Sequence, residues 1–424
     1  MRPFPGARSG VRSTALELMR EPNFRIIWSV GILAEFGRRY EILVFSLLIL
    51  DITGSPAQLM LLWVFNNLPR PFVSSAAGYI ADRFSRQRIM LMTQAVNLAT
   101  AGGLLALMLY GLDVLQVWHI FIAAFIQGTT KAVEDPSRRT GIFDIVGRER
   151  LVNAMSLDVI SQNVGKMIGP VVGGLLIQFS GYPEAYMFLL AVHLVNLWLI
   201  SRLRIPDSGP RAAVPPMWSG LGSAFGFAWK TPMLVGMLSI TLVMNALAFP
   251  LQQFIPAVGK DLLDVGPALV GALVAADGFG HLAGAAAMAS TRGVRYHGRY
   301  FTFGSIIVLL ASAAYVWSPW YSLAFVLLFV SGLGQAGFST MQSSIMMLVS
   351  PPAMRGQMMG LLSFCIGIAN LLGALEISFV VSALSLQNTI SLHALVGLTL
   401  LAPVMALTPL VWRPLPQPEP SPVA

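Results

Sequence analysis

The sequence predicts an all-α membrane protein with twelve transmembrane helices arranged as two six-helix bundles. Hydrophobic residues make up 55% of the chain and charged residues only 11%, and long apolar stretches recur along its whole length. A soluble domain needs more charge than this to cover its surface. Each bilayer crossing takes about 20 apolar residues, so 424 residues are enough for twelve spans and their loops.

The apolar stretches are the predicted spans. They are expected to be helices because backbone polar groups find no partner in lipid, and because the runs are too long and too evenly apolar for barrel strands. The predicted spans are residues 24–50, 57–80, 88–110, 115–137, 153–179, 184–203, 231–257, 267–289, 300–317, 320–348, 357–383 and 391–412.

A hydrophilic segment that contains four prolines separates the first six spans from the last six. Such a composition is typical of a linker between domains. We therefore expect an N-terminal bundle over 1–203, a cytoplasmic linker over 204–230, a C-terminal bundle over 231–412 and a disordered cytoplasmic tail over 413–424.

The distribution of basic residues predicts that both termini are cytoplasmic. With this orientation, 21 of the 27 Lys and Arg residues fall in cytoplasmic segments, only Lys260 falls on the opposite side, and five lie inside spans. Cytoplasmic loops of membrane proteins carry such an excess. The net charge of +8 is then a consequence of topology in the inner membrane. We expect the lipid bilayer as the surrounding partner and no nucleic acid.

The segment after the second span contains a motif with the letters Gly78-Tyr-Ile-Ala-Asp82-Arg83-Phe-Ser85-Arg86-Gln-Arg88. It resembles the G-x-x-x-D-R-x-G-R-[RK] motif of the major facilitator superfamily, which lies between the second and third helices of those transporters. A serine replaces the second glycine of that pattern. The resemblance implies the major facilitator fold. It also implies that the glycine, the aspartate and the three arginines form a cytoplasmic gate that holds the outward-facing state.

The fifth span contains a second motif, Gly165-Lys-Met-Ile-Gly169-Pro170-Val-Val-Gly173-Gly174. It is similar to the G-x-x-x-G-P-x-x-G-G element of major facilitator exporters. Small residues at this spacing permit close helix contact, and the proline can bend the helix. Generic helix packing is the alternative explanation of these glycines. Other patches resemble the branch of macrolide and siderophore exporters: Thr53-Gly54-Ser55-Pro56, Leu68-Pro69-Arg70 and Arg355-Gly356-Gln-Met-Met-Gly360.

Ionisable and polar residues inside the predicted spans are the candidate substrate and proton pathway, since a charged residue costs about 2.5–3.5 kcal/mol to insert at the centre of a span. The first half holds five basic and five acidic residues of this kind. Spacing along the helix allows Glu35 to pair with Arg39, and Arg38 with Glu41. The candidates are Glu35, Arg38, Arg39, Glu41, Asn66, Arg70, Lys131, Glu134, Asp135, Asp158, Lys166 and Asp277.

Two interpretations of these charges stay open. Near the cytoplasmic end of the fourth span, the acidic and basic residues favour ion pairs that hold the bundle together. Nearer mid-membrane, the charges favour a pathway for polar or ionic cargo, because packing alone could use apolar residues at lower cost. In the second half, Asp277 is a candidate proton carrier, with His281 four residues away as its possible hydrogen-bond partner.

The leading hypothesis is proton-coupled efflux of a small organic compound, drug-like or siderophore-like, by alternating access. Uptake of a polar or anionic metabolite by the same fold is the first alternative, and a non-transporting membrane scaffold is the second. The sequence has no G-x-x-x-x-G-K-[ST] loop and no H-E-x-x-H motif, so we expect neither an enzyme nor an ATP-driven pump. We also expect no cofactor, no metal site and a monomer.

Overall fold

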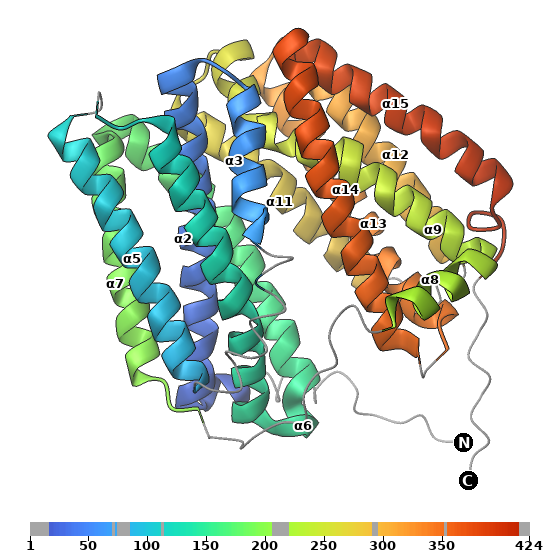
Figure 1. Ribbon diagram of the computed structural model, residues 1–424, viewed down its shortest axis with the longest axis horizontal. Coiled ribbons are helices and arrows are strands. Elements are labelled where there is room, and N and C mark those ends of the chain that lie inside the picture. The colour runs from blue at the N-terminus through green and yellow to red at the C-terminus, as the bar shows by residue number, and fades with distance from the viewer. Residues whose placement is uncertain are drawn as a thin grey trace. The chain divides into compact units, whose positions relative to one another are not determined.

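All regular elements in the described part of the computed structural model are helical (Figure 1). The structure describes residues 17–69, 73, 85–111, 114–205, 220–290, 296–351 and 354–414. Within these ranges, eight helices are long and apolar enough to cross a membrane. The prediction of an all-helical protein with many membrane spans is therefore confirmed, whereas the number twelve stays a prediction.

The chain forms two compact units. Unit 1 comprises Met1–Thr53 and Phe65–Val214, and unit 2 comprises Gly54–Val64 and Pro215–Ala424. The division after Val214 falls within the segment predicted to link the two bundles. The short stretch Gly54–Val64, which begins the second predicted span, groups with unit 2.

Unit 1 contains the helices that carry most of the candidate residues. Helix α2 packs along α6 and against α7, and α5 packs against both α6 and α7. The helices are α2 (Pro22–Thr53), α5 (Arg86–Tyr110), α6 (Val117–Ser180) and α7 (Tyr182–Arg202), together with the last residues of α3 (Ala57–Asn67).

Helix α6 contains both the fourth and the fifth predicted spans. Its 64 residues would make a straight rod of about 96 Å, far longer than a bilayer is thick. The backbone leaves the helical conformation at Gly147, where φ is 73° and ψ is 179°. Glycine adopts this conformation without steric penalty. The helix therefore forms two limbs, and Figure 1 shows them meeting at the end where α6 is labelled.

Unit 2 has two helices, α11 and α12, packed along α13. Its seventh predicted span is interrupted, since α9 (Pro232–Val243) is followed from 244 to 262 by short π-helical, 3₁₀ and α-helical turns that include two prolines. Proline removes a backbone donor and breaks regular α-helix. The other helices are α8 (Leu221–Lys230), α11 (Pro267–Ser290), α12 (His297–Tyr315), α13 (Tyr321–Val349), α14 (Arg355–Ala383) and α15 (Leu386–Leu407).

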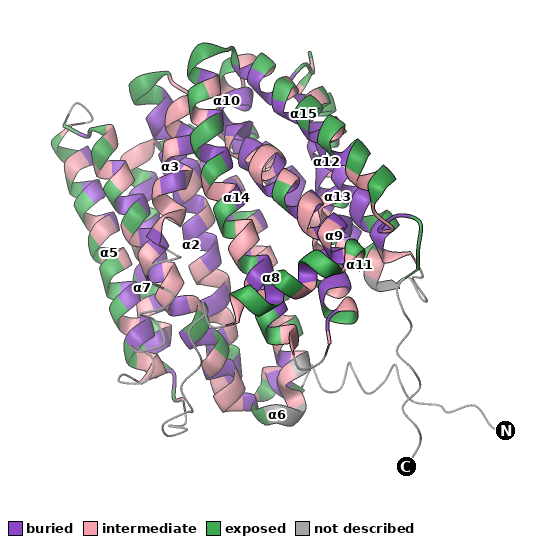
Figure 2. Ribbon diagram, turned by 45° about the vertical axis from the view of Figure 1, so that its right-hand side comes forward, coloured by how far each residue is buried: buried purple, intermediate pink, exposed green. Residues whose placement is uncertain are grey.

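Large apolar side chains are exposed along many of these helices, and Figure 2 shows where exposed residues lie on the ribbon. Leu109, Phe179, Trp198 and Phe379 are each more than half exposed. Water would disfavour so much exposed apolar surface, and monomeric soluble proteins rarely show it. Contact with lipid accounts for it.

Candidate functional site

A cluster of ionic side chains joins α2 to the first limb of α6 in unit 1. Glu35 accepts hydrogen bonds from Arg38 Nη2 at 2.7 Å and from Arg39 Nε at 3.0 Å. Lys131 Nζ lies 3.6 Å from the same carboxylate, and Arg38 Nη2 lies 3.6 Å from Asp135 Oδ1. Glu35 and Arg38 are both buried. The predicted pairing of Glu35 with Arg39 is confirmed, and three cations lie against the Glu35 carboxylate, of which Arg38 also lies near Asp135.

The predicted pairing of Arg38 with Glu41 is wrong. Helix side chains point back toward the helix N-terminus, so Arg38 reaches the residue one turn before it, Glu35, through both Nε and Nη2. Glu41 instead accepts a hydrogen bond from Gln127 Nε2 at 2.7 Å and one from the Tyr186 hydroxyl at 3.4 Å. Glu41 is thus a buried carboxylate whose hydrogen-bond partners are neutral.

The amide of Gln127 connects Glu41 to the end of α3. Asn66 Nδ2 donates to Gln127 Oε1 at 2.9 Å and to the Ala124 carbonyl at 3.2 Å. The two helices approach so closely that a Cβ at Gly128 would lie 1.8 Å from the Asn66 carbonyl oxygen. The candidate Asn66 therefore belongs to the same polar network as Glu41.

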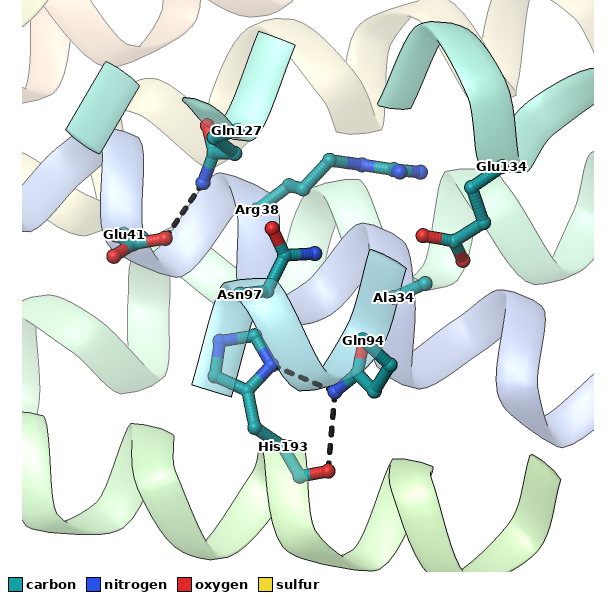
Figure 3. A pocket seen from close by; sticks show the side chains of 8 residues that line it. All are labelled: Ala34, Arg38, Glu41, Gln94, Asn97, Gln127, Glu134 and His193. Carbon is teal, nitrogen blue, oxygen red and sulfur yellow. Dashed lines mark hydrogen bonds between the residues drawn. The ribbon is translucent and has the colours of Figure 1, made fainter. Parts of the chain in front are cut away.

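A small pocket lies among these side chains (Figure 3). Its volume is about 10 Å³, far below the range of about 300–1,000 Å³ that is common for ligand pockets. This space is about the size of one water molecule or one small polar group. The lining residues come from α2, α5, α6 and α7: Ala34, Arg38, Glu41, Gln94, Asn97, Gln127, Glu134 and His193.

The pocket offers one unpaired hydrogen-bond donor and one unpaired acceptor. Gln94 Nε2 donates to the carbonyl of His193 at 3.0 Å and lies 2.9 Å from its Nδ1. Because an amide NH₂ can only donate, Nδ1 accepts, and the neutral imidazole carries its proton on Nε2. Among the described residues, neither that Nε2 nor Glu134 Oε1 has a hydrogen-bond partner, and both atoms are buried. The pocket thus suits a polar group that can both accept and donate.

Sequence reasoning missed four polar residues of this pocket. It selected charged residues and one asparagine, whereas Gln94, Asn97, Gln127 and His193 are uncharged. A signal was present, because each is a polar residue inside a predicted span, and Gln94 and Asn97 are three positions apart on one helix face.

A second buried ion pair joins the two limbs of α6. Arg138 on the first limb pairs with Asp158 on the second, and both side chains are almost fully buried. Gln162 Nε2 also donates to Asp158, at 2.8 Å. A Cβ at Gly31 of α2 would lie 2.9 Å from Arg138 Nη1, so that glycine leaves room for the guanidinium. These contacts favour a structural role for Asp158, while the candidate Lys166 lies half-buried two turns further along.

Part of the predicted gate lies outside the described residues, namely Gly78, Asp82 and Arg83, and so does the candidate Arg70. Two of its arginines begin α5. Arg86 Nε lies 2.8 Å from Asp144 Oδ2 of α6, and Ser85 Oγ accepts a hydrogen bond from the Arg88 backbone at 3.4 Å. The serine that departs from the motif therefore caps the helix. Asp144 is a partner that sequence reasoning did not select.

The glycine motif of the fifth span lies against the backbone of α2. A Cβ at Gly165 would lie 2.7 Å from Ile32 O and Phe36 N, and one at Gly169 would lie 2.7 Å from Phe36 O. The close helix contact expected of these glycines is therefore present. The rest of the motif is buried beside them: Pro170, Gly173 and Gly174.

In unit 2, the candidate Asp277 is buried within α11. Four residues further on, His281 Nε2 lies 3.2 Å from Ser339 Oγ of α13. Helices α11 and α13 are tightly packed here, because a Cβ at Gly332 would lie 2.0 Å from the Asp277 carbonyl oxygen.

Comparison with known proteins gives the family. Residues 13–413 match the family described as transmembrane secretion effectors, a branch of the major facilitator superfamily. The chain belongs to this family. The matched residues extend over both units and include the gate motif and the glycine motif. The predicted resemblance to major facilitator exporters is therefore confirmed.

Relatives of this major facilitator protein include efflux proteins. The multidrug efflux pump Tap of Mycolicibacterium fortuitum is 24% identical over 346 residues, which are 80% of this chain and 84% of Tap. The enterobactin exporter EntS of Shigella flexneri is 26% identical over 297 residues, 67% of each chain. The crystal structure of the nucleoside transporter NupG has the same fold, with a TM-score of 0.71, 13% identity and coverage of 91% of this chain and 98% of NupG.

Proposed function

We propose that this protein is a proton-coupled exporter of small organic molecules, drug-like or siderophore-like, with twelve spans in two six-helix bundles and both termini in the cytoplasm. Membership of a secretion family and the efflux activity in the names of its relatives support export. Alternating access of a pocket between the two sides of the membrane is the mechanism expected of this fold.

The buried charge cluster of unit 1 is the observation that carries the proposal. Charges inside a membrane protein cost several kcal/mol each unless they are paired. Glu35 is paired with cations, but Glu41 has only neutral hydrogen-bond partners and lines a pocket that also holds unpaired polar atoms. Helix packing alone does not require a buried carboxylate and unpaired polar atoms at this place. A pathway for a proton and for polar groups of a substrate requires them.

The pocket suggests how the residues divide the work. Arg38 and Glu134 line it as opposite charges, and Gln94, Gln127 and His193 supply neutral hydrogen-bonding groups. Glu41 is our first candidate for the carboxylate that exchanges a proton during transport, and Asp277 of unit 2 is the second. The gate motif would then close the cytoplasmic side, with Arg86 held by Asp144.

Vesicle transport tests the proposal. Membrane vesicles of both orientations are given ethidium as a drug-like probe and enterobactin as a siderophore probe, with and without an imposed pH gradient. We expect inverted vesicles with an acidic lumen to accumulate at least one probe. Equal accumulation with and without the pH gradient would refute proton coupling. The basic side chains around Glu35 favour uptake of an anionic metabolite as the second candidate function, and accumulation only in right-side-out vesicles would support it.

A further inference from the structure

Unit 2 contains a histidine–carboxylate pair that the candidate site does not include. His393 Nε2 of α15 lies 2.8 Å from Glu376 Oε2 of α14. The other ring nitrogen, Nδ1, lies 2.7 Å from the backbone carbonyl oxygen of Thr389. His393 is 3% exposed, whereas the side chain of Glu376 is 52% exposed. The pair therefore joins a buried imidazole to a half-exposed carboxylate.

Counting protons shows that the pair binds one. A carbonyl oxygen cannot donate, so Nδ1 must carry a proton and donate it to Thr389. The contact between Nε2 and Oε2 then needs a second proton, because a bare imidazole nitrogen and a bare carboxylate oxygen are both acceptors. That proton is either on the imidazole, which gives an imidazolium–carboxylate pair, or on the carboxyl group. Both arrangements hold one exchangeable proton between the two side chains.

Other titratable groups do not take part in this pair. The elements packed against α14 and α15 carry several such groups, yet in the described part of the chain neither His393 nor Glu376 forms an ion pair or a side-chain hydrogen bond with any of them. The groups are Lys230 on α8, His297, Arg299, Tyr300 and Tyr315 on α12, Tyr321 on α13, and Arg355 and Cys365 on α14.

The surroundings of Glu376 connect proton release to a change in structure. Leu372 and Phe379 lie one turn before and after it on α14, and they are 60% and 77% exposed. A carboxylate that lost the shared proton would stand among apolar side chains inside a membrane span, which is costly. Release of the proton is therefore favoured only when the environment of the pair changes.

The depth of the pair in the span sets the side from which it is reached. Glu376 is seven residues before the end of α14, and His393 is seven residues after the start of α15. Both therefore lie about 10 Å of helix from the turn that joins the two helices. With the proposed cytoplasmic termini, this turn is extracytoplasmic. A proton-driven exporter must load its proton from that side.

We propose that His393 and Glu376 form a proton-binding site that loads from the extracytoplasmic side during the transport cycle. The role in transport rests on the proposed function, whereas binding of the proton by the pair does not. The two parts are therefore tested by separate measurements on the full chain.

Spectroscopy of the purified protein tests proton binding. Ring-¹⁵N histidine labelling gives five imidazole signals for the five histidines, and the signal lost in His393→Gln belongs to His393. At neutral pH we expect either a doubly protonated His393 ring or an infrared band of a protonated carboxyl group that disappears in Glu376→Gln. If the His393 ring carries a proton on Nδ1 alone and no carboxyl band depends on Glu376, the proposal is overturned.

Proteoliposome transport tests the role in coupling. We expect Glu376→Gln and His393→Gln each to reduce the ethidium accumulation driven by a pH gradient at least tenfold. Ethidium exchange without a gradient should continue in both variants. Glu184→Gln is the matched control, because it removes an exposed carboxylate at the start of α7 and should keep gradient-driven accumulation. Unchanged accumulation in both test variants would refute the coupling role. A wild-type protein that transports neither probe would instead refute the proposed function and leave the spectroscopic result standing.

Discussion

Two carboxylates of α2, six residues apart, have opposite electrostatic surroundings. Glu35 forms ion pairs with Arg38, Arg39 and Lys131. Glu41 accepts hydrogen bonds from the amide of Gln127 and the phenol of Tyr186. In a membrane interior, removal of a charge that balances others leaves those charges uncompensated, whereas removal of a charge with neutral partners does not. The two residues should therefore respond differently to the same Glu→Gln change.

Glu35→Gln is expected to destabilise the protein. The substitution keeps the shape of the side chain but removes the carboxylate that pairs with Arg38, Arg39 and Lys131, and breaking a buried pair in this way costs about 3–5 kcal/mol. Thermal unfolding of the detergent-solubilised protein measures the loss. Glu35→Gln/Arg39→Gln serves as the control and should be more stable than Glu35→Gln alone, because it also removes a cation whose ion pair is with Glu35. Equal stability of the two variants would contradict the ion-pair argument.

Glu41→Gln is expected to spare stability and reduce transport. No cation depends on Glu41, so the change in unfolding free energy should stay within about 1 kcal/mol, as for substitutions that break no strong interaction. Accumulation driven by a pH gradient should fall at least tenfold, since glutamine cannot carry an exchangeable proton. Vesicles that kept full gradient-driven accumulation would show that Glu41 is not the proton-exchanging carboxylate.

Residue spacing predicted some contacts of the site and not others. The four-residue spacing of Glu35 and Arg39 identified their pair because both residues lie on one helix. It gave the wrong partner for Glu41, whose hydrogen bonds come from α6 and α7. Contacts between helices depend on how the helices pack, and periodicity within one span does not contain that information. His193 was missed for the same reason.

At the scale of elements, glycine decides how closely two helices can approach. The second limb of α6 lies against the α2 backbone at Gly165 and Gly169, and α3 lies against α6 at Gly128. The letters of the glycine motif predicted the first of these contacts because small residues four apart form a flat helix face. Gly128 also has small residues four positions before and after it, Ala124 and Ala132, but this repeat was not selected in the sequence.

Gly165→Ala is expected to separate α6 from α2. The new Cβ would lie 2.7 Å from two backbone atoms, which cannot move aside as a side-chain tip can, and overpacking of this kind costs about 1–3 kcal/mol. Gly103→Ala in α5 is the matched control, since no atom lies within 4 Å of its Cβ position and alanine favours helix by up to about 1 kcal/mol. The unfolding temperature should fall in Gly165→Ala, and it should stay the same or rise in Gly103→Ala. The same result for both would mean that helix propensity, not contact, governs this position.

The lengths of the apolar runs in the sequence predicted the positions of the helices better than the positions of their interruptions. The predicted span at 24–50 lies inside α2, and that at 267–289 lies inside α11, because a run of apolar residues must form a helix in lipid. The turn at Gly147 and the irregular turns after Val243 depend on single residues and on packing. An average over about twenty residues does not detect them.

At the scale of the whole molecule, the orientation in the membrane rests on basic residues alone. Helix α7 offers a direct test because an exposed serine lies beside each of its ends: Ser180 just before it and Ser201 within its last turn. Cys365 is the sole cysteine of the chain, so Cys365→Ser provides a background without cysteine. In that background, Ser180→Cys and Ser201→Cys place the same thiol at opposite ends of one span.

The positive-inside distribution puts Ser180 outside the cell and Ser201 in the cytoplasm. A membrane-impermeant maleimide added to intact cells should therefore label Ser180→Cys strongly and Ser201→Cys weakly, and permeabilised cells should label both. Labelling of Ser201→Cys alone in intact cells would invert the topology, and the turn between α14 and α15 would then face the cytoplasm. His393 and Glu376 would in that case be reached from the side where an exporter releases its proton, so this one measurement also decides the direction assigned to that pair.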